Sequence, residues 1–214
     1  MKKVAVIGIG IFGFNLVKEL YENGIEVIAI DKDKDVVQEV KDFATKAIVS
    51  DGLDKNLFES LGLRENDVVV VSFGEDLAAS TLITLHLKQL KIRNIIVKAP
   101  NTEYKQVLES VGATEVIIPE KEMASKIAKS LVSPNIIDYI PLAEDYIIGE
   151  IAPPVNFLGK TLADVHLRSK YGVNVIAIRD TLTDTLKMVP PDYKIKDSEI
   201  LVVIGKSKDI DKIK

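Results

Sequence analysis

The sequence has no cysteine, no tryptophan, no long hydrophobic run and no large excess of one charge. Without cysteine, a disulfide framework and a cysteine nucleophile are both excluded. No apolar run approaches the ~20 residues of a membrane-spanning helix, and the chain starts directly with a strand-like segment, so we expect neither a membrane span nor a signal peptide. The 28 basic and 32 acidic residues give a formal net charge of −4 without a basic stripe, which argues against nucleic acid as a partner.

Strand-like and helical segments alternate from the start of the chain to about residue 133. Apolar runs typical of buried parallel strands cover 3–8, 25–30, 46–49, 68–72, 94–98 and 115–118. Apolar residues at helical spacing cover 11–22, 33–43, 54–60, 76–90, 103–111 and 120–132. Six strand–helix units in series predict an α/β fold, a Rossmann-like doubly wound parallel sheet with right-handed crossovers.

The pattern changes after Ser133-Pro134-Asn135, which is predicted to end the last of these helices. Shorter strands are predicted at 146–151, 173–179 and 199–204, and a short helix at 161–165. We therefore expect two domains, one over 1–133 and a smaller α+β domain over 136–214.

A glycine-rich turn, Gly8-Ile9-Gly10-Ile11-Phe12-Gly13, joins the first predicted strand to the first predicted helix. In this context Gly8 permits a sharp turn, Gly10 lets a pyrophosphate approach the backbone, and Gly13 lets the helix pack closely on the strand. The free N–H groups and the dipole of the helix attract phosphate. A glycine-rich turn without a ligand is the alternative, but the strand–turn–helix context favours binding.

Asp31 ends the second predicted strand. A carboxylate in that place accepts hydrogen bonds from both ribose hydroxyls and repels a 2′-phosphate. We therefore expect the first domain to bind an adenine nucleotide (AMP, ADP or ATP) or NAD(H), with NADP disfavoured.

Ligands of open parallel sheets bind beyond the carboxyl ends of the strands, so we expect further site residues there. The segments after strands two, three and four supply Lys32, Asp51, Gly52, Ser72, Phe73 and Gly74. Lys98 follows strand five as a counter-charge for phosphate, and Glu120 follows strand six. Three alternatives stay open: Asp51 as a turn residue, Lys98 as a solvated strand end, and Glu120 as a helix N-terminal acid.

The sequence lacks an obvious acid–base or metal-binding constellation. A dehydrogenase needs an acid or base beside the nicotinamide, but His86 and His166 are not at metal-ligand spacing and do not follow strands of the first domain. We interpret both as ordinary helix or surface residues, and predict binding without catalysis and no metal site. An NAD-dependent oxidoreductase is the alternative function. A redox-sensing transcription factor is disfavoured because a basic recognition helix is missing.

Met123, Ile127 and Leu131 recur at four-residue spacing on the last predicted helix of the first domain. On pattern alone, such a stripe favours packing into a core. Contact with a partner subunit is the alternative.

The sequence resembles the cytosolic regulatory subunits of Trk/Ktr-type bacterial potassium-uptake systems over essentially its whole length. The motifs that carry the resemblance are, in order, VIGIGIFG, AIDKD, SDG, ASTLITLHLKQL, IIVKA, VLESVGATEVIIPEKEMASKIAKSL and LRSKYGVNVIAI. The resemblance implies a nucleotide-binding KTN (or RCK N-terminal) domain, followed by an RCK C-terminal regulatory domain.

The resemblance also implies partners and a location. Such subunits form homodimers or higher rings, including octamers, beneath an integral-membrane potassium-transport subunit. They are cytoplasmic and lie at the inner face of the plasma membrane through that partner. Binding of ATP, ADP, NAD or NADH changes the ring and so the transport activity. The helix at 120–132 would then contact a neighbouring subunit, and Glu120 would match an acidic residue near the phosphates where a cation binds.

Two stretches qualify what the resemblance implies. Ile11 stands where the family often has an arginine that meets the terminal phosphate, and an aliphatic side chain cannot make that charge-assisted contact. We therefore expect weak discrimination between ATP and ADP.

In some relatives the C-terminal domain binds cyclic di-AMP at its dimer interface. The matching stretch here holds Arg168 and Asn174, with Pro190 nearby; a solvated helix-end charge and a strand-end residue are the alternative.

Overall fold

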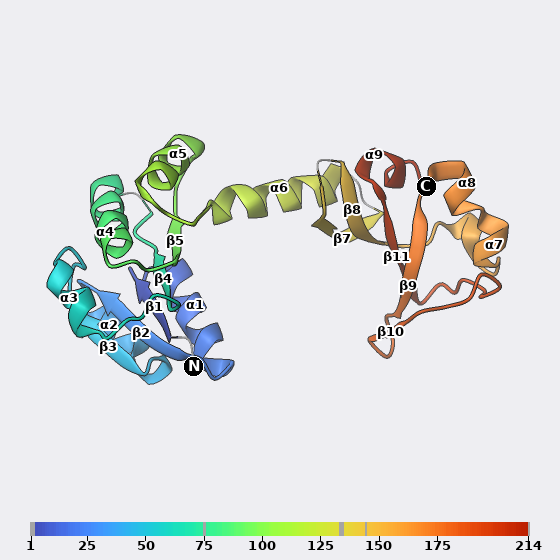
Figure 1. Cartoon of the computed structure of the whole chain (residues 1–214). Coiled ribbons are helices and arrows are strands. Elements are labelled where there is room, and N and C mark those ends of the chain that lie inside the picture. Colours follow the sequence, from blue (N-terminus) through green and yellow to red (C-terminus); the bar gives the residue numbers. More distant parts are fainter. Residues whose placement is uncertain (1–2, 75, 133–134, 144, 214) are drawn as a thin grey trace. The chain divides into compact units, whose positions relative to one another are not determined.

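The computed structural model describes residues 3–74, 76–132, 135–143 and 145–213 (Figure 1). The chain divides into two compact units, Met1–Met123 and Ala124–Lys214. This division falls inside the last helix of the parallel-sheet region, whereas the predicted domain limits fall after that helix. Ser133 and Pro134, which were predicted to end the helix, lie outside the described residues.

The first unit is built on a six-stranded sheet whose order is β3-β2-β1-β4-β5-β6, with every neighbouring pair parallel. This order confirms the predicted doubly wound fold. The strands are β1 (Lys3–Ile7), β2 (Glu26–Asp31), β3 (Lys46–Val49), β4 (Val68–Val71), β5 (Asn94–Lys98) and β6 (Glu115–Ile117). The helices are α1 (Ile11–Glu22), α2 (Lys34–Val40), the 3-10 helix η1 (Lys41–Phe43), α3 (Lys55–Ser60), α4 (Leu77–Gln89), α5 (Thr102–Val111) and α6 (Pro119–Val132).

Helices cover both faces of this sheet because its central strands are apolar on both sides. On one face, Val4 and Val6 of β1 pack with Val17 of α1 and Val40 of α2. On the other face, alternate strand residues pack against α3, α4 and α5 through buried side chains that include Phe58, Ile83, Leu87 and Leu108. The carboxyl ends of β1, β2 and β4 therefore stay open at one edge of the sheet.

The second unit contains a five-stranded antiparallel sheet with the order β10-β9-β11-β8-β7. Its strands are β7 (Ile136–Pro141), β8 (Tyr146–Ile151), β9 (Asn174–Asp180), β10 (Thr185–Lys187) and β11 (Glu199–Lys206). Its helices are η2 (Val155–Phe157), α7 (Leu162–Val165), α8 (Leu167–Tyr171) and α9 (Ser207–Ile210). The predicted smaller α+β domain is confirmed as a fold, but β7, β10, α8 and α9 were not predicted. No described helix is long and apolar enough to cross a membrane.

The prediction that the apolar stripe of α6 packs into a core is wrong. No described residue of α6 is buried, and Met123, Ile127 and Leu131 keep 56%, 52% and 77% of their surface exposed. Periodicity alone identified the stripe correctly but could not tell whether anything in the same chain covers it. An exposed apolar stripe is typical of a surface that meets another molecule.

Asp67, the residue before β4, joins the two central strands at their start. Its side chain is buried, with Oδ1 accepting a hydrogen bond from Lys3 N (2.9 Å) and Oδ2 accepting one from Arg64 N (2.7 Å). Burial by itself would raise the pKa of Asp67, but the two backbone hydrogen bonds and the nearby positive charges outweigh it and lower the pKa. The ionised form is therefore the one that stabilises the fold.

We predict that Asp67→Asn lowers the free energy of unfolding by about 1–3 kcal/mol at neutral pH, because one buried N–H loses its acceptor. A carboxyl whose pKa is lowered in the folded state stabilises above its ordinary pKa, and the stabilisation is lost as the pH falls through the lowered pKa. The difference between wild type and variant should therefore shrink under acid conditions. Urea denaturation at pH 7 and at about pH 3 tests this, with the exposed Asp42→Asn as control. A difference that persists unchanged in acid would contradict the assignment.

Candidate functional site

Two glycines of the turn between β1 and α1 are required by the fold itself. Gly8 has φ +90°, and a Cβ there would lie 3.0 Å from the carbonyl carbon of Ser72. A Cβ on Gly13 would lie only 2.2 Å from the carbonyl oxygen of Gly8. A side chain at Gly8 would therefore push the turn away from the segment after β4, and one at Gly13 would push α1 away from the turn.

Gly10 differs from these two glycines because nothing in the described protein requires it. Its φ of −71° is accessible to any residue, and a Cβ there would meet no atom within 4 Å. Gly10 precedes the first turn of α1, which has no side-chain cap and no acidic residue. The missing side chain thus leaves open space in front of N–H groups that have no partner within the helix.

Asp31, at the end of β2, holds the glycine turn in place. Its Oδ2 accepts a hydrogen bond from Ile9 N (2.6 Å), and its Oδ1 accepts one from Asp33 N (2.9 Å). A carboxylate has about four lone-pair positions, so two remain for hydroxyl donors. Asp31 therefore positions the turn and still has the capacity to recognise a ribose.

A cavity of about 570 Å³ opens at the carboxyl ends of β1, β2 and β4. Its volume is within the usual range for small-molecule and cofactor sites. Seven of the predicted site residues line it: Gly8, Gly10, Asp31, Lys32, Asp51, Ser72 and Phe73. Sequence analysis missed Leu53, Asp76 and Ala79, which also line it. Asp76 is the N-cap of α4, where its Oδ1 accepts a hydrogen bond from Ala79 N. An N-cap aspartate has no sequence pattern that would also indicate a ligand, so the sequence did not predict Asp76 as a site residue.

Asp51 fits both of its interpretations. Its Oδ1 accepts a hydrogen bond from Leu53 N (3.0 Å), as in an Asx turn, and Asp51 is also one of the residues that line the cavity. Gly52 does not line the cavity. It has φ +72°, and a Cβ there would lie 3.0 Å from Ile7 Cγ2, so packing under the turn accounts for this glycine.

Lys98 lies beside the glycine turn and forms an ion pair with Glu120. Lys98 Nζ and Glu120 Oε1 are 2.6 Å apart. The Lys98 ammonium also lies 6.0 Å from the Phe12 ring centroid and would be 3.9 Å from a Cβ on Gly74. The hydrogen bond from Lys98 lowers the pKa of Glu120, and its position in the first turn of α6 adds to the effect. Lys98, Glu120, Phe12 and Gly74 therefore form a second group next to the cavity lining rather than within it.

Ile11, the first residue of α1, has 89% of its surface exposed. It does not line the cavity, and a polar side chain at this position would not disturb the core. Gly13 lies behind the turn and contributes packing only.

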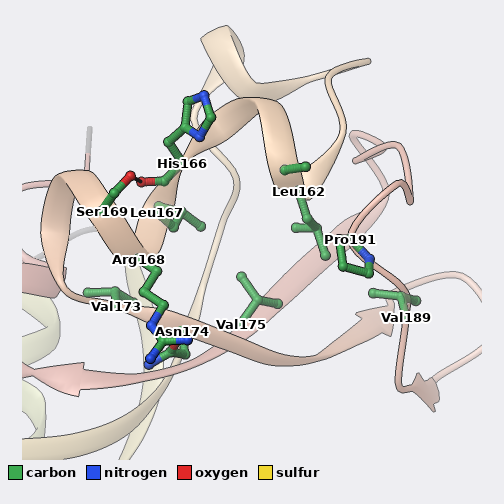
Figure 2. Close-up of a pocket in the computed structure, with 11 residues that line it drawn as sticks. Leu162, His166, Leu167, Arg168, Ser169, Val173, Asn174, Val175, Val189 and Pro191 are labelled. Atoms are coloured by element: carbon green, nitrogen blue, oxygen red, sulfur yellow. Dashed lines mark hydrogen bonds between the residues drawn. The ribbon is translucent and has the colours of Figure 1, made fainter.

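A second cavity, of about 680 Å³, lies in the C-terminal unit between α7, α8 and β9 (Figure 2). Arg168 extends from α8 toward β9, and Asn174 lies at the start of that strand. Pro191 lines this cavity, whereas the predicted Pro190 does not. The Pro190 carbonyl instead accepts a hydrogen bond from Tyr193 N. The apolar part of the lining includes Leu162, Val175 and Val189.

The two histidines lie on different units. His86 is within α4, and its Nδ1 is buried without a hydrogen-bond partner. His166 separates α7 from α8 with φ +55° and lines the second cavity. Among the residues that the structure describes, no three His, Asp or Glu side chains converge as a metal-binding group.

Comparison with known proteins identifies the family. Residues 4–119 match the TrkA-N domain, and residues 150–214 match the TrkA-C domain. Ktr system potassium uptake proteins C and A of Bacillus subtilis are each 40% identical to this chain over 98% of its length and 94% of theirs. The chain therefore belongs to the Ktr/Trk family of potassium uptake proteins with TrkA-N and TrkA-C domains. These relatives are named as uptake proteins and not as enzymes, which agrees with the prediction.

Solved structures confirm the fold. The GsuK channel bound to NAD matches 98% of this chain with a TM-score of 0.64 and 14% identity. The match covers only 38% of the GsuK chain. The match shows a shared fold.

The contrast between the glycines generates a stability prediction. Gly13→Ala should lower the free energy of unfolding by about 1–3 kcal/mol or more, because the added methyl group overlaps the Gly8 carbonyl oxygen. Gly10→Ala should lower it by less than about 1 kcal/mol, the usual difference between Gly and Ala before a helix. Thermal and urea denaturation of both variants measure this, and equal losses would show that both glycines serve packing.

Proposed function

We propose that this chain is a nucleotide-sensing regulatory subunit that gates a membrane potassium-uptake transporter or channel of the Ktr/Trk type. It binds an adenine nucleotide or NAD(H) at the glycine turn, and the ligand favours one arrangement of subunits through differential contacts. The chain acts without catalysis. It is cytoplasmic and lies at the inner face of the plasma membrane through its integral-membrane partner.

Gly10 is the observation that carries this proposal. The fold explains Gly8 and Gly13, but it does not explain why residue 10 lacks a side chain. The open space lies in front of the N-terminus of α1, whose dipole and free N–H groups suit a phosphate. A ligand with a pyrophosphate or phosphate group accounts for the missing side chain, and the adjoining cavity accepts its nucleoside.

The acidic lining of the cavity favours particular nucleotides. Asp31 has acceptor positions left for the ribose hydroxyls, and a 2′-phosphate would meet repulsion from Asp31 and Asp51. AMP, ADP, ATP and NAD(H) therefore fit the site better than NADP.

The α6 stripe supports a homodimer or a higher ring, up to an octamer. Met123, Ile127 and Leu131 are exposed on one helix, and a second copy of the chain would remove them from water. The net charge of −4 does not favour nucleic acid as a partner.

An NAD-dependent oxidoreductase is the competing function. It would need a proton donor or acceptor beside a bound nicotinamide. Neither His86 nor His166 is among the residues described as lining the first cavity. Turnover of NADH with a carbonyl substrate would support this alternative.

A thermal-shift panel with AMP, ADP, ATP, NAD, NADH and NADP tests the site. A ligand at one hundred times its dissociation constant stabilises the folded state by ~2.7 kcal/mol. We expect a clear shift for wild type and at least a tenfold weaker affinity, about 1.4 kcal/mol, for Gly10→Ala. Gly10→Ala is a sharper variant than Asp31→Ala, since Asp31 also accepts a hydrogen bond that holds the turn in place. No shift with any nucleotide, or equal shifts for both proteins, would refute the site.

Ile11 generates a prediction about phosphate number. Wild type should bind ATP and ADP with similar affinity, because the aliphatic side chain of Ile11 cannot donate a charge-assisted hydrogen bond to a terminal phosphate. Ile11→Arg should increase the preference for ATP by about tenfold through a charge-assisted hydrogen bond. Isothermal titration calorimetry measures both affinities, with Ile11→Gln as an uncharged control. Comparable ATP-to-ADP ratios in wild type and Ile11→Arg would count against a role for this position.

The second cavity supports a further ligand, cyclic di-AMP. It brings together the Arg168 guanidinium, which pairs with phosphate, and the Asn174 amide, which pairs with a base or ribose, over an apolar floor. We expect cyclic di-AMP to raise the melting temperature of wild type but not of Arg168→Ala. Lys170→Ala, on the same helix but outside the cavity, is the control. Unchanged melting of wild type would remove this ligand.

A further inference from the structure

Lys98 occupies a place where three elements of the first unit meet. Its ammonium lies near Phe12 in the first turn of α1, near Gly74 in the segment after β4, and against Glu120 in the first turn of α6. The Lys98 side chain is 18% exposed and the Glu120 side chain 66% exposed. Lys98 is thus held among protein atoms, whereas its carboxylate partner has access to solvent.

The charges around Lys98 are unbalanced on the side of α1. The N-terminus of α1 has a partial positive charge and no acidic residue in its first turn. The Lys98 ammonium adds a full positive charge nearby. Within the described part of the chain, Glu120 is the carboxylate that pairs with this ammonium. A phosphate group bound in front of α1 would satisfy the same ammonium and would repel Glu120.

We propose that Glu120 and the phosphate group of the bound nucleotide compete for Lys98, so that nucleotide binding releases the first turn of α6 from β5. The proposal rests on the nucleotide site proposed above. The lysine stem is flexible and its head is a point charge, so Lys98 can turn from one anion to the other without movement of β5. Phosphate binding is thereby coupled to α6, the helix that carries the exposed apolar stripe.

The competition predicts an unusual sign for a substitution at a ligand-binding site. Glu120→Gln should tighten ADP binding by about threefold, because the ligand no longer has to displace a partner from Lys98. The affinity for adenosine, which has no phosphate, should not change. Lys98→Met should weaken ADP binding by about tenfold. In the Lys98→Met background, Glu120→Gln should not increase the affinity for ADP, because the ammonium for which Glu120 and the phosphate compete is missing.

Isothermal titration calorimetry of the full chain with ADP and with adenosine, in a chelator to exclude divalent cations, provides the measurement. Glu122→Gln is the matched control, because Glu122 lies in the same first turn of α6 and its substitution removes the same charge. Its ADP affinity should equal that of wild type.

Each outcome of these titrations decides the question. Tighter ADP binding by Glu120→Gln, lost in the Lys98→Met background, supports the competition. An unchanged or weaker affinity for Glu120→Gln refutes it, as does a gain that persists without Lys98 or that also occurs in Glu122→Gln. Failure of wild type to bind any nucleotide of the thermal-shift panel refutes the nucleotide site itself, whereas normal nucleotide binding with an unaltered Glu120→Gln affinity refutes the competition alone.

Discussion

The close approach of Gly13 to the carbonyl oxygen of Gly8 is the contact on which the candidate site depends. It allows α1 to begin directly behind the end of β1, so the free N–H groups of the helix face the open edge of the sheet. The parallel order of the strands then brings Asp31, Asp51 and Ser72 to the same edge. A methyl group at residue 13 would separate α1 from the sheet and displace the turn that the other residues surround.

The arrangement of the first unit could be predicted because its signals are local and repeated. Apolar runs and helical spacing determine the element order, and right-handed crossovers then leave few topologies. The second unit was predicted less completely. The strand β10 has only three residues, all of them exposed, and so short a segment cannot show a periodic pattern. The five-residue α8 is too short to show a period.

The sequence predicts most of the residues that belong to the candidate site but not the separate role of each. The motif named three glycines, yet only the packing distances distinguish Gly10 from Gly8 and Gly13. Asp31 was predicted to accept hydrogen bonds from a ribose, but its carboxylate also accepts one from the backbone N–H of Ile9. The ion pair between Lys98 and Glu120 joins the end of β5 to the start of α6. No spacing rule predicts which charged side chains form an ion pair when they are so far apart in the sequence.

Membership of the Ktr/Trk family and the geometry of the turn lead to one central claim, that a nucleotide phosphate binds at the N-terminus of α1. Amide hydrogen exchange of the full chain with and without ADP tests this claim most directly. The account predicts slower exchange at residues 10–14 on addition of ADP, with a smaller effect in Gly10→Ala. Binding of ADP that leaves the exchange of residues 10–14 unchanged would contradict it.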